Sequence, residues 1–204
     1  LGGGPIGCEL AQAFARLGSR VTQIEMAPRI MGREDKDVAD FIQNAFVEEG
    51  ISVLTGYRAK EVRVDGERKT LICVNDEREV RVEFDDLLIA VGRRANAGGF
   101  GLEELGVALN ANGTIMADDR LQTAIPNIYA AGDVAGPYQF THTAAHQAWY
   151  ASVNALFAPF KKFRADYSVI PWATFVDPEV ARVGLNEQEA KERKIPYEVT
   201  VFDI

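Results

Sequence analysis

The chain has 204 residues, 47% of them hydrophobic and 25% charged, a composition typical of soluble globular proteins. Its formal net charge of −8 argues against function through attraction to phosphate backbones or anionic lipid, so no nucleic acid partner is expected. No apolar run reaches the roughly 18–20 residues of a membrane span, no signal peptide is visible, and two cysteines are too few for a disulfide scaffold, so the cytoplasm is the expected location.

The first feature along the chain is the segment Gly2-Gly3-Gly4-Pro5-Ile6-Gly7, which fits the G-x-G-x-x-G pattern of a phosphate-binding turn. In that pattern Gly2 permits the tight turn, Gly4 lets the backbone approach a pyrophosphate, and Gly7 allows a closely packed helix. A helix is expected at about Cys8–Leu17, and its first amides would face the phosphate. This context favours a nucleotide site over a purely structural glycine turn.

The next strand, beginning near Arg20, stops at an acidic residue, Glu25, which lies 18 positions after Gly7. A carboxylate at this place can accept hydrogen bonds from the adenosine ribose hydroxyls, and it would repel the 2′-phosphate of NADP. Arg29 and Arg33 follow and could reach back toward such a phosphate, although solvated arginines are the simpler interpretation. The pattern therefore favours NAD, with NADP as the less favoured alternative.

Hydrophobic periodicity predicts helices on both sides of this strand. The first would bury a stripe at i, i+4 and i+7, formed by Leu10, Phe14 and Leu17. The second, at about Asp37–Glu49, would bury Val38, Phe41, Ile42 and Ala45, and a strand at Ile51–Leu54 would follow. Strands that alternate with helices in this way predict a parallel sheet.

From Ala59 the period of the hydrophobic residues becomes two, which predicts an antiparallel meander with one solvated face. Its strands are expected at Glu61–Val64, Thr70–Val74 and Val80–Phe84. The continuous apolar run Leu87–Val91 is instead typical of a buried central strand, and it leads into Gly92-Arg93-Arg94. A glycine-rich crossover follows at 97–101.

The second half of the chain centres on the segment Thr123–Val134, which contains Gly132-Asp133 at the expected end of a strand. A long helix is expected at His142–Phe157, and the sequence becomes rich in β-forming residues from Tyr167 onward. A short acidic helix near 186–194 and a strand at Tyr197–Phe202 complete the pattern.

Four ordered segments together resemble the pyridine nucleotide-disulfide oxidoreductases, within the branch of dihydrolipoamide dehydrogenase and mercuric reductase. These segments are Gly2–Met26, Ala90–Arg94, Thr123–Val134 and Pro171–Leu185. The resemblance implies an α/β fold with a Rossmann-like NAD-binding domain and meander at 1–96, its first strand truncated. It further implies the C-terminal half of an FAD-binding domain at 97–165 and the truncated start of an α+β dimerisation domain at 166–204.

The resemblance also implies roles for individual residues. One set would line the nicotinamide dinucleotide beside the glycine turn: Ala90, Val91, Gly92 and Arg93. Asp133, preceded by Gly132, would hydrogen-bond the ribityl or pyrophosphate region of FAD, and Thr141 would begin the helix whose amides face the flavin. Glu9 would lie near the flavin on its nicotinamide side.

Several family features are missing. Cys8 and Cys73 are 65 positions apart, so they do not form the redox-active C-x4-C pair and are interpreted as inert buried thiols. The family's C-terminal His-x-x-x-x-Glu motif is also absent, so no catalytic residue is assigned in this chain. His142 and His146 are spaced one helical turn apart, but no third ligand accompanies them and no metal is expected. Ala95 replaces a proline that family members often have.

The expected function is therefore that of part of an FAD-dependent NAD(P)H oxidoreductase. Hydride would pass from nicotinamide C4 to flavin N5, and electrons would go to a cysteine pair outside this chain and then to a disulfide or metal-ion acceptor. The intact protein is expected to be a homodimer, whereas these 204 residues are not expected to turn over alone. A stand-alone nicotinamide-binding module and a flavin-dependent NADH oxidase remain alternatives, and the acceptor (lipoamide, mercuric ion, glutathione or another) stays open.

Overall fold

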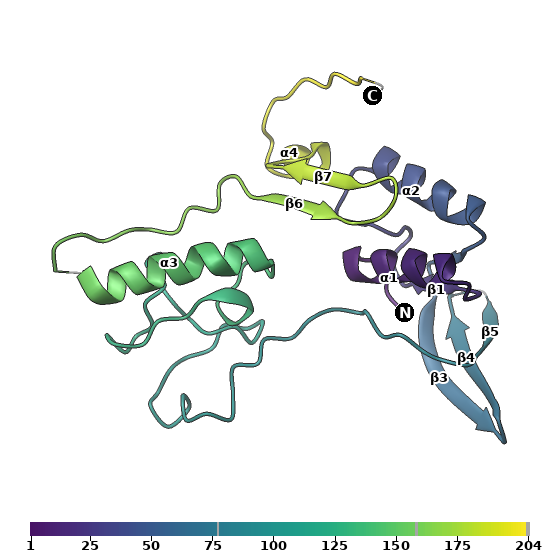
Figure 1. The fold of residues 1–204 in the computed structure, drawn as a ribbon, viewed down its shortest axis with the longest axis horizontal. Coiled ribbons are helices and arrows are strands. Elements are labelled where there is room, and N and C mark those ends of the chain that lie inside the picture. The colour runs from purple at the N-terminus through teal and green to yellow at the C-terminus, as the bar shows by residue number, and fades with distance from the viewer. Residues whose placement is uncertain (77, 158, 203–204) are drawn as a thin grey trace. The chain divides into compact units, whose positions relative to one another are not determined.

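The computed structural model describes residues 1–76, 78–157 and 159–202, and the chain divides into two compact units (Figure 1). The first unit comprises Leu1–Gly92 together with Pro171–Ile204, and the second comprises Arg93–Ile170. The segment expected to open the dimerisation domain is therefore part of the same compact unit as the glycine-rich turn. Each unit is described below by itself.

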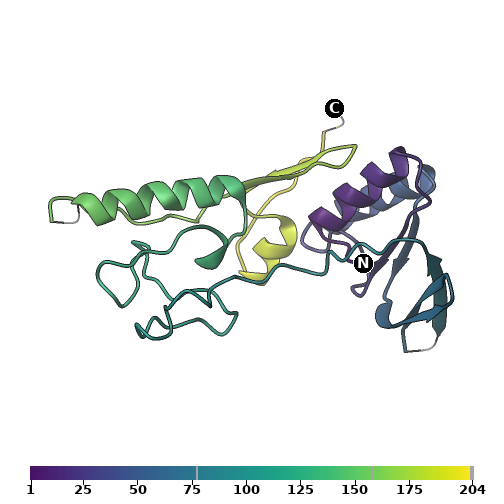
Figure 2. The same cartoon turned by 60° about the horizontal axis from the view of Figure 1, so that its bottom comes forward.

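The first unit begins with the turn–helix–strand arrangement that the sequence predicts. Helix α1 spans Pro5–Arg16 and is followed by strand β1 (Thr22–Glu25). Helix α2 (Lys36–Glu48) then leads to strand β2 (Ser52–Thr55), which pairs in parallel with β1, Glu25 lying opposite Thr55. Both helices pack side by side in this unit (Figure 2).

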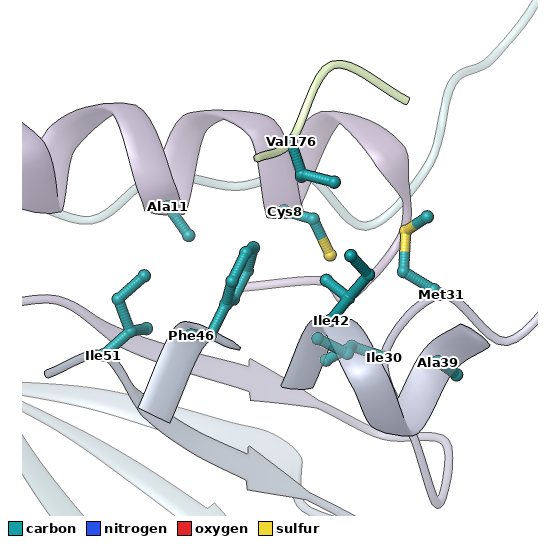
Figure 3. Packing of buried hydrophobic residues seen from close by; sticks show 9 residues of the cluster. All are labelled: Cys8, Ala11, Ile30, Met31, Ala39, Ile42, Phe46, Ile51 and Val176. Carbon is teal, nitrogen blue, oxygen red and sulfur yellow. The ribbon is translucent and has the colours of Figure 1, made fainter. Parts of the chain in front are cut away.

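The core of this unit is formed between α1, α2 and the loop that joins β1 to α2 (Figure 3). It contains Cys8, Ala11, Ile30, Met31, Ala39, Ile42, Phe46, Ile51 and Val176. The apolar stripe predicted for α1 is wrong, because Phe14 and Leu17 are 46% and 81% exposed. The close approach of Gly7 to the Gly2 carbonyl oxygen turns another face of α1 inward, which is formed by Gly7, Cys8, Ala11 and Gln12. The stripe predicted for α2 is wrong in part, since Phe41 is exposed and Phe46 is buried.

The predicted meander is present as strands β3 (Arg58–Asp65), β4 (Arg68–Val74) and β5 (Glu79–Phe84), paired antiparallel in this order. Leu71 and Cys73 of β4 pack with Ile24 of β1 in a second small core. By contrast, the buried strand predicted at Leu87–Val91 is wrong: the segment is not a strand, and Ile89 and Val91 are exposed. Its backbone is hydrogen-bonded to Leu1, whose amino group donates to the Leu88 carbonyl oxygen and whose carbonyl oxygen accepts from the Ala90 amide. Within the described residues these bonds do not extend into the successive pairs of a ladder.

The C-terminal part of the first unit is a hairpin of β6 (Pro171–Thr174) and β7 (Val180–Val183), followed by helix α4 (Glu187–Glu192). It is attached to α1 by a reciprocal pair of hydrogen bonds between the Gln12 side chain and the Asp177 backbone, both 2.7 Å. The strand predicted at 197–202 is wrong, because these residues form no strand. They pair with no strand among the described residues, and β-structure requires hydrogen bonds to a neighbouring strand.

The second unit contains little regular structure besides the 3-10 turn η1 (Gly132–Val134) and helix α3 (Thr141–Phe157). The segment before Gly132 forms only isolated bridges, one of them between Gln122 and Tyr129, so the strand predicted to end there is wrong. A core of Ala97, Val107, Ile115 and Ala130 holds the loops together. Within the described ranges, no helix has the length and hydropathy needed to cross a membrane.

Candidate dinucleotide-binding turns

At two of the three motif positions, backbone atoms lie too close to the glycine for any side chain to fit. A Cβ atom on Gly2 would lie 2.3 Å from the carbonyl oxygen of Ala90, and Gly2 also has a φ of +106°. A Cβ atom on Gly7 would lie 2.1 Å from the carbonyl oxygen of Gly2. Neither approach is possible for another residue, so these two glycines are required by the fold of the turn itself.

Gly4, the middle glycine of the motif, differs from both. A Cβ atom there would meet no atom of the described residues within 4 Å, and its backbone has an ordinary extended conformation (φ −77°, ψ 179°). Gly4 is the N-cap of α1, Pro5 and Ile6 begin the helix, and no side chain of the described residues caps the first amides. The open space at a helix N-terminus is what a pyrophosphate requires, so the turn fits the dinucleotide that the motif predicts.

Glu25 is the last residue of β1 and lies beside this turn, and its carboxylate already accepts two backbone hydrogen bonds. Its Oε2 atom accepts a hydrogen bond from the Gly3 amide (2.5 Å) and its Oε1 atom accepts one from the Ala27 amide (2.6 Å). The loop beyond is tied to the same place, because the Met31 amide donates to the Gly3 carbonyl oxygen at 2.6 Å. The carboxylate therefore shapes the turn, a role that the sequence did not indicate, and each oxygen keeps a lone pair for a ribose hydroxyl.

The segment Ala90–Gly92 also contacts the glycine turn. The Ala90 amide donates to the Leu1 carbonyl oxygen at 2.8 Å, and the Ala90 carbonyl oxygen lies against Gly2. Val91, exposed, and Gly92, with a φ of +136°, follow directly. The predicted residues Gly2, Gly4, Gly7, Glu25 and Ala90 are thus brought together within the first unit.

The second predicted turn lies in the second unit and is organised by polar side chains. Asp133 pairs with Arg93, its Oδ2 atom 2.7 Å from Nη1, and the same nitrogen donates to the Gln139 carbonyl oxygen at 3.3 Å. Arg93, expected beside nicotinamide, therefore contacts the aspartate expected beside flavin. Thr141 is the first residue of α3 and is exposed.

A buried amide side chain, Gln147 on α3, also contacts this turn. Its Oε1 atom accepts from the Gly132 amide and its Nε2 atom donates to the Gly136 carbonyl oxygen, both at 2.6 Å. Gly132 has a φ of +80° and packs against Ala144 of the same helix. Sequence reasoning missed Gln147, because a glutamine within an expected helix belongs to no motif.

Both cysteines are buried, as predicted. The Cys8 thiol donates to the Gly3 carbonyl oxygen at 3.3 Å, and burial raises its pKa to about 11. Burial also raises the pKa of the Cys73 thiol. His142 stacks on Phe140 and His146 on Tyr150, and no group of three potential metal ligands occurs among the described residues.

A buried ion pair that the sequence also did not reveal joins the C-terminal hairpin to the loop beside the glycine turn. Arg182 of β7 lies 3.4 Å from the Glu34 carboxylate, and these side chains are 11% and 7% exposed. The Arg182 guanidinium also covers the ring of Trp172, whose indole donates to Glu34 at 3.2 Å. Because Glu34 donates its amide to the Met31 carbonyl oxygen, this cluster is connected to the residue that holds Gly3.

Comparison with known proteins identifies the family of this chain. Residues 1–148 match the family model described as pyridine nucleotide-disulphide oxidoreductase, and residues 170–204 match the dimerisation domain of that family. The chain belongs to this family. The α/β fold class and the family resemblance that the sequence predicted are thereby confirmed.

Curated relatives carry two different names. The dihydrolipoyl dehydrogenase of Chlamydia pneumoniae is 38% identical over 202 residues, which cover 99% of this chain and 42% of that protein. The mercuric reductase of Streptomyces lividans is 38% identical over 204 residues, which cover 100% and 42%. The chain therefore spans about two fifths of the length of the curated relatives it matches.

A similar solved structure is the HOCl-induced flavoprotein disulfide reductase RclA from Escherichia coli. It has a TM-score of 0.82 and 33% sequence identity, over 94% of this chain and 43% of that one. Membership of the family implies the use of FAD and a nicotinamide dinucleotide, and it does not separate NAD from NADP.

Proposed function

We propose that the protein carrying this chain is an FAD-dependent NAD(P)H oxidoreductase that reduces a disulfide or a metal ion through a redox-active cysteine pair outside the chain. When bound, the cofactors supply the hydride transfer from nicotinamide to flavin. Residues 1–96 would form the NAD-binding domain, 97–165 the C-terminal half of the FAD-binding domain, and 166–204 the start of the dimerisation domain. The match of residues 170–204 to the family's dimerisation domain supports a homodimer.

The observation that carries this proposal is the contrast among the three motif glycines. Gly2 and Gly7 are closed by the backbone of Ala90 and Gly2 respectively, whereas the space at Gly4 is open and lies at the N-terminus of α1. A turn that needed glycine only for its own fold would not leave one of the three positions open. The nicotinamide dinucleotide would lie along Gly2–Gly7, with Ala90, Val91 and Gly92 beside it and Glu25 at the adenosine ribose.

Glu25 favours NAD over NADP within this proposal. Its carboxylate is held by the Gly3 and Ala27 amides and is directed at the turn. A ribose 2′-hydroxyl can donate to such a carboxylate, whereas a 2′-phosphate would be repelled by it.

The experiment compares two variants, Gly4→Ala and its control Gly32→Ala. Neither substitution introduces a clash: a Cβ atom on Gly32 would be 3.9 Å from the Arg29 carbonyl oxygen, and neither glycine has a positive φ. The free energy of unfolding should therefore change little in both variants. Gly4→Ala should raise the dissociation constant for NADH about tenfold or more, since a methyl group would displace the pyrophosphate, while Gly32→Ala should leave it unchanged. Equal NADH binding by both variants would refute the dinucleotide site.

The flavin site is proposed at Gly132 and Asp133, with Thr141 at the N-terminus of α3 and Arg93 in contact with Asp133. The support is the half-exposed carboxylate, which is fixed by a charged partner and could accept a ribityl hydroxyl. Asp133→Ala in the complete protein should yield substoichiometric FAD without a change in fold by circular dichroism. Full retention of FAD in this variant would contradict the assignment, and NADH binding without any FAD binding by the complete protein would favour a nicotinamide-binding module.

The electron acceptor is proposed by class only. The relatives named above are a dihydrolipoyl dehydrogenase, a mercuric reductase and a disulfide reductase, so a disulfide or a metal ion is the acceptor to test. Steady-state NADH oxidation by the complete protein with lipoamide, glutathione disulfide or Hg²⁺ distinguishes these classes. NADH oxidation that needs only dioxygen would instead favour an NADH oxidase.

A further inference from the structure

We propose that Gln147 is a positioning residue for FAD: it fixes the backbone on both sides of Asp133 and so sets where that carboxylate lies. This inference rests on the proposed flavin role of Asp133. Gln147 is 1% exposed and comes from the second turn of α3, and it has no contact with the Asp133 side chain among the hydrogen bonds of the structure.

The contacts of Gln147 form a clamp across the turn. Oε1 accepts from the amide of Gly132, the residue before Asp133, and Nε2 donates to the carbonyl oxygen of Gly136, three residues after it. Nε2 also donates to the Tyr167 hydroxyl at 2.8 Å, which anchors the amide outside the turn. One neutral side chain thus satisfies a buried donor and a buried acceptor of the same five-residue loop.

Apart from Gln147, the loop is held next to Asp133 by the Ile115 amide, which donates to the Val134 carbonyl oxygen at 2.7 Å, whereas both of its ends are glycines. Gly132 has a positive φ, which gives its backbone the wide conformational range of glycine, and Gly136 likewise has a φ of +62°. Inside the loop, the Ala135 and Gly136 amides both turn back to the Gly132 carbonyl oxygen. Without Gln147, the Gly132 amide and the Gly136 carbonyl oxygen would be unpaired in a buried place, and the loop could relieve this only by moving. Asp133 would move with it.

A matched control lies two turns further along the same helix. Asn154 is 2% exposed and is also a buried amide with three hydrogen bonds, to the Arg120 carbonyl oxygen and to the backbone of Phe163. Its contacts stabilise the other end of α3 and do not involve residues 132–136. Replacing it therefore removes as many buried hydrogen bonds without releasing the Asp133 turn.

The experiment uses the complete protein and compares Gln147→Met with Asn154→Leu, each an apolar side chain of similar shape. The readouts are the dissociation constant for FAD, the visible circular dichroism of bound FAD, and the urea midpoint of the apoprotein. Both variants should lose similar stability. Gln147→Met should raise the dissociation constant for FAD about tenfold and change the visible spectrum of the flavin, whereas Asn154→Leu should leave both within about twofold.

Two further variants test the clamp more finely. Gln147→Glu keeps an acceptor for the Gly132 amide and loses the donor to Gly136, so its FAD affinity should lie between those of the wild type and Gln147→Met. Tyr167→Phe removes only the outer anchor and should weaken FAD binding about twofold to threefold, which keeps the proposal testable if Gln147→Met does not fold.

Equal losses of FAD affinity in Gln147→Met and Asn154→Leu, in proportion to their losses of stability, would overturn the positioning role. An unchanged FAD affinity in Tyr167→Phe and Gln147→Glu would overturn it as well. A different failure is recognised separately: if Asp133→Ala retains FAD, then the proposed flavin role of Asp133 is wrong whatever the Gln147 variants do.

Discussion

The turn at Gly2–Gly7 and the turn at Gly132–Gly136 are both proposed to bind a dinucleotide, yet they are held in opposite ways. The first is closed by direct backbone contacts at Gly2 and Gly7, which only the absence of a side chain allows. The second is held by two long polar side chains, Gln147 and Arg93, that reach it from elsewhere in its unit.

This difference explains why the two turns are not equally visible in a sequence. A position that is too crowded for a side chain must itself be glycine, so the glycines of the first turn form a motif. A turn held by a long side chain depends on a residue elsewhere in the sequence. Gln147, for example, lies 15 positions after the Gly132 amide that it binds. In the second turn, the sequence therefore points only to Asp133, the residue proposed to bind FAD.

The largest expected effect is a loss of stability that tests the steric closure of the first turn. Gly7→Ala would place a methyl group 2.1 Å from the Gly2 carbonyl oxygen, and such overpacking costs about 3 kcal/mol or more in unfolding free energy. The better helix propensity of alanine offsets only about 1 kcal/mol of this. Gly132→Ala, in ordinary contact with Ala144 at 3.4 Å and with a positive φ, should cost about 1 kcal/mol.

Urea denaturation of the two variants measures both losses. If Gly132→Ala destabilises the protein more than Gly7→Ala, the second turn is the more tightly closed one and the comparison is wrong.

The next effect concerns the carboxylate beside the first turn. Glu25→Arg should shift coenzyme preference from NADH toward NADPH, because it replaces a group that repels a 2′-phosphate by one that attracts it. It also leaves the Gly3 and Ala27 amides without their acceptor, so a loss of about 2 kcal/mol in stability should accompany the shift. Glu25→Gln is the control, since it keeps the shape of the side chain and one acceptor oxygen.

Fluorescence titration with NADH and NADPH gives the two dissociation constants for each variant. The hypothesis fails if the unmutated protein binds both coenzymes equally.

The elements that the sequence predicted well are those set by local rules. The turn, the helices α1 and α2 and the meander follow from glycine spacing and hydrophobic period, which act between near neighbours in the chain. The apolar stripe of α1 was predicted wrongly, because Phe14 and Leu17 satisfy the helical period but the closeness imposed by Gly7 selects Cys8 and Ala11 for the buried face.

The parts that the sequence could not reveal depend on contacts between distant segments. The run Leu87–Val91 has the composition of a buried strand, but a strand also needs a ladder of hydrogen bonds, and the bonds of this segment with Leu1 do not form one among the described residues. The Glu34–Arg182 pair is equally inaccessible to local rules, because each residue alone looks like a solvated charge. Among the candidate site residues, the glycines and Glu25 came from spacing, whereas Arg93 and Asp133 came from family resemblance.

The prediction with the smallest expected effect on the protein uses the Cys8 thiol to test how tightly the first turn is closed. Cys8 lies against the Gly3 carbonyl oxygen, and its pKa is raised to about 11 by burial. Ionisation alone should then make its alkylation at pH 8 about 100-fold slower than that of an ordinary thiol, and burial should slow it further. Peptide mass spectrometry after iodoacetamide treatment should therefore find Cys8 and Cys73 unmodified in the folded protein and both modified in urea.

The same thiol reports on the turn at higher pH. Because the pKa of Cys8 in the folded protein exceeds its ordinary value of 9.0, the neutral thiol favours folding fully below pH 9, and this contribution is lost as the pH rises through about 11. Alkylation of Cys8 should increase over this interval, and NADH should slow it, since a ligand that binds the closed turn stabilises it. Rapid labelling of Cys8 at pH 8 would show that the turn opens readily, and backbone closure would then not be what distinguishes it from the turn at Asp133.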